Sequence, residues 1–244
     1  MIRNQRYGDR ARIGYTSPPL TSEVFPYEFY KVAPDGVTLV ITTLAITVRS
    51  KDEVDRSYDI SMKAAREMAA AGCDAIVLGG VPINLARGAE NADRVIAELE
   101  AELGVPVASS ASAQKEAFAA LGCRRLVVAH PYKGEDNSRF DDYAEKFGCS
   151  VLGTRAFGSA FNRIGAIPDN AALDMARALM AAHPDADTIM FPSPHWPVIG
   201  AIEPLEKEFG VTVMSSIQAI LWRALRLAGI KDSIPGYGRL LREF

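Results

Sequence analysis

DAIVLGG at residues 74–80 returns as DTIMFPS at 187–193, and GVPVASSASAQKEAFAALG at 104–122 returns as GVTVMSSIQAILWRALRLAG at 210–229. Each copy has an aspartate before a short apolar run, then a helical stretch, Gly-Val, a second apolar run, a Ser-Ser pair and a helix that ends at glycine. RIGYTSPP from Arg12 and RLVVAHPY from Arg125 are separated by the same offset as Asp74 and Asp187. A repeat of this length is half a protein rather than a solenoid unit, so the sequence predicts two similar halves that face each other across a cleft.

Short β-rich runs alternate with helical patterns along the whole chain. Helical patterns end at glycines, as where Ile60, Ala64 and Met68 share a face before Gly72, and a cap at Asp169 is expected to begin a later helix. The β-rich runs are 12–17, 37–44, 74–79, 105–109, 125–130, 150–155, 187–192 and 211–215. Continuous apolar strands that alternate with helices indicate parallel sheets covered on both faces. We therefore expect an α/β fold of two pseudo-symmetric, flavodoxin-like domains, each a four-stranded parallel sheet flanked by helices, with the active-site cleft between them.

The last long helical pattern, 217–227, is expected to cross back and pack on the first half. The predicted first domain is therefore 1–115 plus 218–244, and the predicted second domain is 116–217. No long linker or low-complexity segment interrupts the chain.

Composition narrows the range of partners. The 244 residues are 48% hydrophobic and 23% charged, with a net charge of −3, as in an ordinary soluble globular protein. No basic stripe favours nucleic acid or an anionic membrane, and no apolar stretch is long enough to span a bilayer or to form a signal peptide. Cys73, Cys123 and Cys149 are widely spaced, which indicates a reducing cytoplasm. The oligomeric state stays open, a homo-oligomer being one option.

Ligands of open parallel sheets bind at the carboxyl ends of the strands. In both halves the residues there are small or hydroxylated, and several precede helices, whose first N–H groups bind carboxylate. These strand ends are Ser17-Pro18-Pro19, Gly79-Gly80-Val81-Pro82, Ser109-Ser110, Pro131-Tyr132, Pro192-Ser193-Pro194-His195 and Ser215-Ser216. They predict a site for a small carboxylate. The chain has no phosphate-binding glycine motif and no metal-ligand cluster, so we expect neither a nucleotide cofactor nor a metal.

Two further motifs are PYKGEDN at 131–137 and the ending RLAG (226–229) with PGYGRLL (235–241). Together with the repeat and its Ser-Ser segments they resemble the aspartate/glutamate racemase superfamily, and within it the arylmalonate decarboxylase and maleate cis-trans isomerase branch. The resemblance covers almost the whole chain. It implies carbon-acid chemistry on a small carboxylic acid without a cofactor.

The resemblance also implies which residues to compare. Members usually carry a cysteine at the end of the third strand of each half, and the two thiols exchange protons with opposite faces of the substrate; the decarboxylases keep one. The corresponding positions here are Gly80 and Ser193, so both usual thiols are missing. The three cysteines that the chain does have are expected to be packing residues, because free cysteine is most often buried.

Catalytic roles are predicted for Tyr132, Ser193 and His195. Tyr132 matches the family's hole-forming tyrosine, whose phenol donates to a carboxylate or enediolate oxygen. A hydroxyl such as that of Ser193 is a poor acid without a partner. His195, which titrates near neutral pH, is either that partner or a residue that caps a helix or faces solvent. His130 is either a second candidate or a hydrogen-bonded structural histidine.

Substrate contacts are expected from residues at both sets of strand ends, and Asn137 is expected to clasp a carboxylate, to cap the following helix, or both. The predicted substrate-binding residues are Pro18, Thr21, Gly80, Val81, Asn137, Pro194, Ser110 and Ser216.

Three functions are compatible with these residues. The leading one is a cofactor-independent lyase that forms an enediolate from a small dicarboxylic acid. The second is a maleate-type isomerase or a racemase, which the missing thiols weaken because that chemistry resembles a two-thiol mechanism. The third is a carboxylate-binding protein that has lost the chemistry, which the Ser193/His195 pair argues against.

Overall fold

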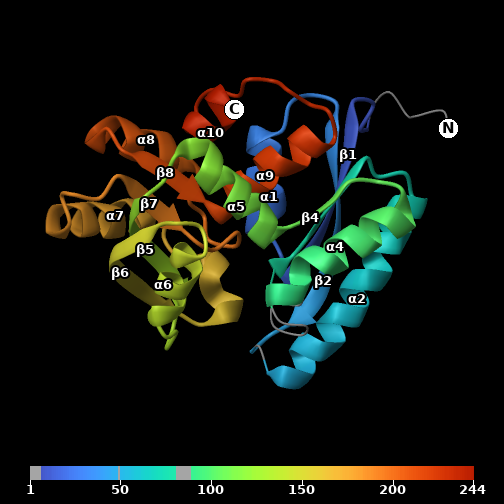
Figure 1. Ribbon diagram of the computed structural model, residues 1–244, viewed down its shortest axis with the longest axis horizontal. Coiled ribbons are helices and arrows are strands. Elements are labelled where there is room, and N and C mark those ends of the chain that lie inside the picture. The colour runs from blue at the N-terminus through green and yellow to red at the C-terminus, as the bar shows by residue number, and fades with distance from the viewer. Residues whose placement is uncertain (1–6, 49, 81–88) are drawn as a thin grey trace. The chain divides into compact units, whose positions relative to one another are not determined.

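The computed structural model describes residues 7–48, 50–80 and 89–244, which form two parallel sheets (Figure 1). The first sheet has the order β2-β1-β3-β4, from β1 (Ala11–Pro19), β2 (Val37–Ile46), β3 (Ala75–Leu78) and β4 (Val107–Ser109). The second has the order β6-β5-β7-β8, from β5 (Arg125–Tyr132), β6 (Ser150–Ser159), β7 (Thr188–Phe191) and β8 (Thr212–Ser215). The predicted α/β fold with two four-stranded parallel sheets is confirmed.

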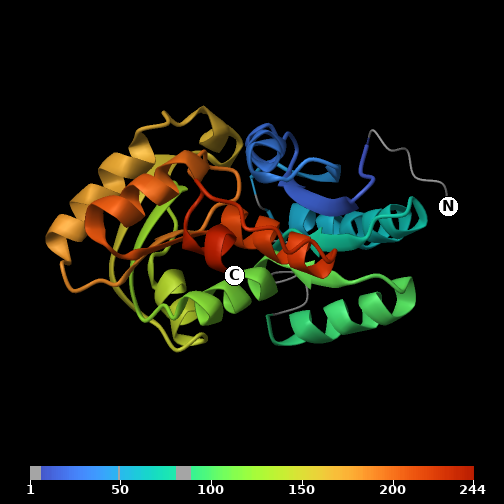
Figure 2. The ribbon, with the colours of Figure 1, turned by 90° about the horizontal axis from the view of Figure 1, so that it is seen from above.

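Helices connect the strands and cover the sheets. Those before β5 are α1 (Val24–Val32), α2 (Lys51–Ala70), α4 (Ala89–Leu103) and α5 (Ser110–Leu121). Those after it are α6 (Ser138–Glu145), the 3-10 helix η1 (Phe161–Ala166), α7 (Ala171–Ala182), α8 (Ile199–Phe209), α9 (Ser216–Leu227) and α10 (Arg239–Glu243). On the second sheet α7 and α8 lie side by side, α7 against β5 and β6 and α8 against β8 (Figure 2).

The repeated aspartates have the same task in each half. Asp74 Oδ2 accepts the backbone N–H of Arg12 at 2.8 Å, and Asp187 Oδ1 accepts that of Arg125 at 3.0 Å. Each aspartate thus ties the start of the third strand of its half to the start of the first strand. This shared bond explains why the repeat begins with an acidic residue in front of an apolar run.

The core follows the apolar pattern of the sequence, but one predicted core residue and one predicted helix cap differ from the structure. In the first sheet's core, Met68 of α2 packs with Ile76 and Leu78 of β3. Ile60, expected on the same helix face as Met68, is 37% exposed, so the buried stripe of α2 runs beside it. The cap expected at Asp169 lies one residue later, at Asn170, which makes no side-chain capping bond.

Among the described residues two compact units form. The first holds the residues up to Ser22, Phe29–Ala113 and Ile220–Asp232, and the second holds Glu23–Glu28, Gln114–Ala219 and Ser233–Phe244. The domain bounds expected from the sequence stay a prediction, which limited proteolysis would test. Within the described part of the chain, no helix has the length and apolar character needed to cross a lipid bilayer.

Candidate active site

The segment that leaves β7 carries three of the predicted site residues at the carboxyl edge of the second sheet. β5 and β7 are paired neighbours in this sheet, so their carboxyl ends lie at the same edge. The Tyr132 hydroxyl, at the end of β5, donates to the backbone carbonyl of Pro192, directly after β7, at 3.4 Å. This bond brings the tyrosine to the segment that continues with Ser193.

Ser193 and His195 are linked through the backbone. Ser193 is fully buried, and its Oγ accepts the backbone N–H of His195 at 3.4 Å. The imidazole of His195 is 9% exposed, and neither ring nitrogen has a hydrogen-bond partner among the described residues. Burial lowers the pKa of His195 to about 3, so the ring is neutral at pH 7. The alternative in which His195 faces solvent is excluded, and the N-cap of α8 is Val198 rather than this histidine.

The rest of this segment is anchored in the interior. Trp196 is fully buried and meets Phe191 edge to face, with ring centroids 5.6 Å apart at 87°. Such aromatic pairs add to the stabilisation that burial provides. Pro194 is half-buried between Ser193 and His195. A proline and a locked indole therefore limit how far Ser193 can move.

His130 holds the side chain of Asn137. The His130 ring is fully buried, its Nε2 lies 2.9 Å from Asn137 Oδ1, and it stacks on Tyr132 with centroids 5.7 Å apart. Burial lowers the pKa of His130, and the bond to Asn137 acts against that shift. Asn137 makes no side-chain cap for α6, so of its two predicted roles the capping one is absent. His130 matches the hydrogen-bonded histidine that the sequence left as an alternative.

The first serine of each Ser-Ser pair has the same structural role in both halves. The first serine ends its strand and caps the next helix: Ser109 Oγ accepts the Ser112 N–H at 3.1 Å, and Ser215 Oγ accepts the Gln218 N–H at 3.2 Å. Serine is a favoured N-cap for this reason. The second serines, Ser110 and Ser216, are 8% and 1% exposed. The Oγ of Ser216 has no hydrogen-bond partner in the part of the chain that the structure describes.

The carboxyl edge of the first sheet is tightly closed around Gly79. Its N–H donates to the carbonyl and to Oγ1 of Thr16, both at 3.0 Å, and a Cβ at this position would collide with Thr16 and Pro18. Pro18 is buried, Gly80 is half-buried and Thr21 is exposed. The predicted contact residue Val81 lies outside the described residues.

The three cysteines lie in the interior, away from the strand ends that carry the predicted site residues. All three cysteines are buried, as expected for packing residues. Burial raises the pKa of Cys73 and Cys123 to about 11, and that of Cys149 also rises. These thiols are therefore protonated near neutral pH. Among the described residues no three His, Cys, Asp or Glu side chains are grouped so that they could hold a metal ion.

Sequence reasoning missed Glu28. Its side chain is 3% exposed, and Oε1 accepts the backbone N–H of Ile199, the first residue of α8, at 3.1 Å. The one available sign was a glutamate next to Phe25 and Phe29 on an otherwise apolar helix. Its partner is too far away in the sequence for any local pattern to reveal it.

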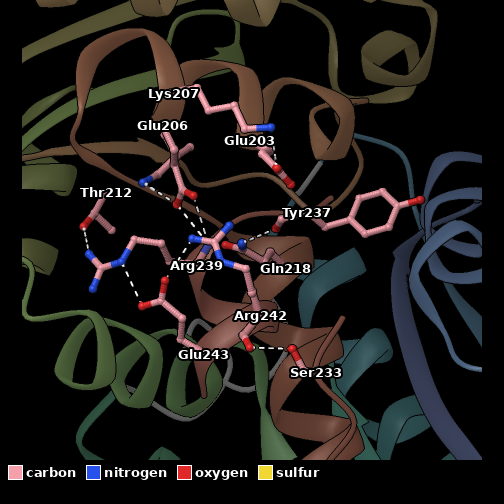
Figure 3. A network of polar contacts seen from close by, with 11 residues as sticks. Glu203, Glu206, Lys207, Thr212, Gln218, Ser233, Tyr237, Arg239, Arg242 and Glu243 are labelled. Atoms are coloured by element: carbon pink, nitrogen blue, oxygen red, sulfur yellow. Dashed lines mark hydrogen bonds and ion pairs between the residues drawn. The ribbon is translucent and has the colours of Figure 1, made fainter. Parts of the chain in front are cut away.

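A cavity of about 650 Å³ lies at the opposite, amino edge of the second sheet, beside Thr188 and Thr212. Figure 3 shows the polar network there, in which both Glu206 carboxylate oxygens accept the Arg239 N–H, at 2.9 and 3.2 Å. Gln218 Nε2 donates to the Tyr237 carbonyl at 2.7 Å. The network fastens the C-terminal segment to α8 and α9. No predicted site residue is among the described residues that line this cavity.

Comparison with known proteins assigns the family. A family model described as arylmalonate decarboxylase matches residues 13–241. Arylmalonate decarboxylase from Bordetella bronchiseptica is 30% identical over 95% of this chain and 96% of its own length, and maleate isomerase from Nocardia farcinica is 33% identical over 56% and 55%. A structure of unliganded arylmalonate decarboxylase superposes with a TM-score of 0.81 at 27% identity, over 96% of this chain and 100% of that one. With the fold, the strand ends and these matches in agreement, the chain belongs to the arylmalonate decarboxylase family.

Proposed function

We propose that this protein is a cofactor-independent lyase that decarboxylates a small dicarboxylic acid through an enediolate. The observation that carries the proposal is the grouping of Tyr132, Ser193 and His195 at one sheet edge in a member of this family. A phenol and a hydroxyl can donate hydrogen bonds to a developing negative charge, and an imidazole can transfer a proton, without a metal or a cofactor.

In the proposed reaction the bond between the α-carbon and one carboxylate breaks and carbon dioxide leaves. The electron pair stays on the α-carbon and the remaining carboxylate as an enediolate. The Tyr132 hydroxyl and the backbone N–H groups after Pro194 stabilise the developing negative charge. A proton then forms the new bond at the α-carbon.

His195 is the proposed source of that proton. Its ring is neutral in the free protein, because burial lowers its pKa to about 3. A bound dicarboxylate brings negative charge near the ring, and an opposite charge within a few ångströms favours the protonated form. The histidine thus takes up a proton when the substrate binds and transfers it to the α-carbon after carbon dioxide has left.

Ser193 occupies the position where the resemblance places a thiol, and Gly80 occupies the other, so the proposal is a cysteine-independent one. The raised pKa values of Cys73 and Cys123 support it, since a protonated buried thiol is a poor base. Thr21 and Gly80 are proposed to contact the substrate on the basis of the sequence alone. Free cysteines also favour the cytoplasm as the compartment.

Maleate isomerase chemistry is the second candidate. It is favoured by the relative from Nocardia farcinica, which matches about half of this chain. An isomerase would break no carbon–carbon bond and release no carbon dioxide, so one experiment can distinguish the two reactions.

That experiment is proton NMR in D₂O of the purified protein with aryl- and alkylmalonates, maleate, and amino and hydroxy diacids. We expect loss of a malonate and a product with deuterium at the α-carbon. Conversion of maleate to fumarate with the malonates untouched would replace the lyase with the isomerase. Line broadening without turnover or exchange across the panel would instead indicate a carboxylate-binding protein.

A further inference from the structure

Helix α8 begins without a cap from its own neighbourhood. The first backbone N–H groups of any helix lack partners within the helix, and the usual remedy is Ser, Thr, Asp or Asn at the N-cap. Here the N-cap is Val198, preceded by Pro197, and it makes no side-chain capping bond. The Val198 carbonyl accepts the Ala201 N–H at 2.9 Å, but no neighbouring side chain caps the Ile199 N–H.

Glu28 supplies an acceptor for that N–H from α1. Its Oε1 lies 3.1 Å from the Ile199 nitrogen, across 171 residues of sequence. Only 3% of the residue is exposed, and burying a carboxylate is costly unless hydrogen bonds compensate for lost water. The amino end of a helix suits a negative charge, because the aligned peptide dipoles leave it partly positive. Residues 23–28 belong to the same compact unit as α8.

The bond lies at one end of the segment that carries Ser193 and His195. The other end is held where the Tyr132 hydroxyl meets the Pro192 carbonyl. Between these two points the segment is locked further by Trp196. Removing Glu28 would release the α8 end and leave the other two restraints in place.

We infer that Glu28 is a positioning residue: it caps α8 from outside and thereby sets where the Ser193–His195 segment sits. The inference rests on the proposed function only in what that segment does, since the position of the segment can be measured without a substrate. Glu28 acts through the backbone and has no assigned contact with substrate.

The chain offers a matched control in Glu206. Both residues are buried glutamates whose carboxylates accept backbone N–H groups; Glu28 binds the start of α8, and Glu206 is itself part of α8 and binds Arg239. Glu206, however, lies in the network at the amino edge of the sheet (Figure 3). A general loss of stability would follow from either substitution, whereas a displaced Ser193–His195 segment should follow only from loss of Glu28.

The test is imidazole NMR of ¹⁵N-labelled protein without ligand, in the wild type, E28A, E28Q and E206Q. The chain has three histidines, so H195N identifies the His195 signals. We expect E28A to shift the His195 signals and E28Q, which keeps an acceptor oxygen, to restore them in part, with E206Q like the wild type. On a turned-over substrate, E28A should lower kcat about tenfold or more with little change in KM, since small misplacements of reacting groups have effects of this size.

Unchanged His195 signals in folded E28A, or equal shifts in E206Q, would overturn the inference. If E28A does not fold, E28D carries the comparison, because its carboxylate is one methylene shorter and is drawn back from the Ile199 N–H. Wild-type His195 signals in E28D would then overturn the inference. Shifted signals together with no turnover by the wild type would uphold the positioning role and reject the proposed reaction, so the two failures are distinguishable.

Discussion

His195 shows at the scale of one residue how burial without a partner changes ionisation. Desolvation lowers its pKa from 6.5 to about 3. Between these values the unfolded chain binds a proton that the folded chain does not, so the stability from the neutral ring is complete above pH 6.5 and is lost as the pH falls. His130, whose pKa is lowered mainly by burial, acts in the same direction.

We predict a pH-dependent difference between the wild type and H195N. From pH 6 to pH 5 the wild type should lose about 1 kcal/mol more of its free energy of unfolding than the variant, because one proton taken up only by the unfolded chain gives a slope of about 1.4 kcal/mol per pH unit. Urea denaturation at the two pH values measures it. Parallel losses in both proteins would mean that the His195 ring is accessible to protons in the folded state.

The hydroxyl of Ser193 is the second feature at this scale. We predict that S193C increases the decarboxylation rate about tenfold or more, because the thiol adds a second proton donor beside His195. A thiol is a far stronger acid than a hydroxyl, and proton transfer by a placed side chain contributes about 100-fold or more. Carbon dioxide release under initial-rate conditions measures the change. The control is S57C on α2, where the buried Ser57 hydroxyl donates to the Val54 carbonyl at 2.7 Å; it should leave the rate unchanged. A drop in rate with S193C would show that the hydroxyl itself is needed.

The positions of the strands and helices were the features that the sequence predicted best. Each expected β-rich run became a strand. The inner strands β1, β3, β5 and β7 are buried on both faces, as continuous apolar runs predict, whereas the edge strand β6 is half-buried to exposed along its length. The glycine that ends α8 at Gly210 has φ of 66°, a left-handed conformation that glycine adopts without strain. The ends of the elements were predicted less well. The N-cap of α7 lies at Asn170 rather than at Asp169, because helix ends fray and can begin one residue earlier or later.

The aspartates before β3 and β7 carry a prediction at the same scale. Burial opposes ionisation of Asp187, but backbone N–H groups of Arg125 and Arg124 and the Thr188 hydroxyl outweigh it and lower the pKa. The stability from this ionised carboxylate is therefore present above pH 3.8 and is lost as the pH falls through the folded-state pKa. D187A should lower the free energy of unfolding by about 0.5–1.5 kcal/mol at pH 7, because the exposed N–H groups of Arg124 and Arg125 exchange a carboxylate acceptor for water.

Urea denaturation checks this value, and D187N, which keeps one acceptor oxygen, should lose less than D187A. Equal stability of D187A and the wild type at pH 7 would mean that the bonds to the start of β5 contribute nothing to folding.

At the scale of the whole molecule, the sequence predicted which residues gather at the sheet edges but not what holds them. Strand ends that follow a repeat can be located from their spacing alone. The bond between Glu28 and Ile199, or the one from Tyr132 to Pro192, joins residues that only the folded chain brings together. For the same reason the burial of His195 could not be inferred from its place after β7.

Each of the two compact units is built from segments that lie far apart in the sequence, which affects how the chain can fold during its synthesis. Domains usually fold one after another during synthesis, the N-terminal one first. Here the first unit needs residues 220–232, and the second needs both 23–28 and 233–244. The first unit is incomplete until residues 220–232 have emerged and the second until residues 233–244 have, so the residues of the first half stay incompletely folded until the second half has been made.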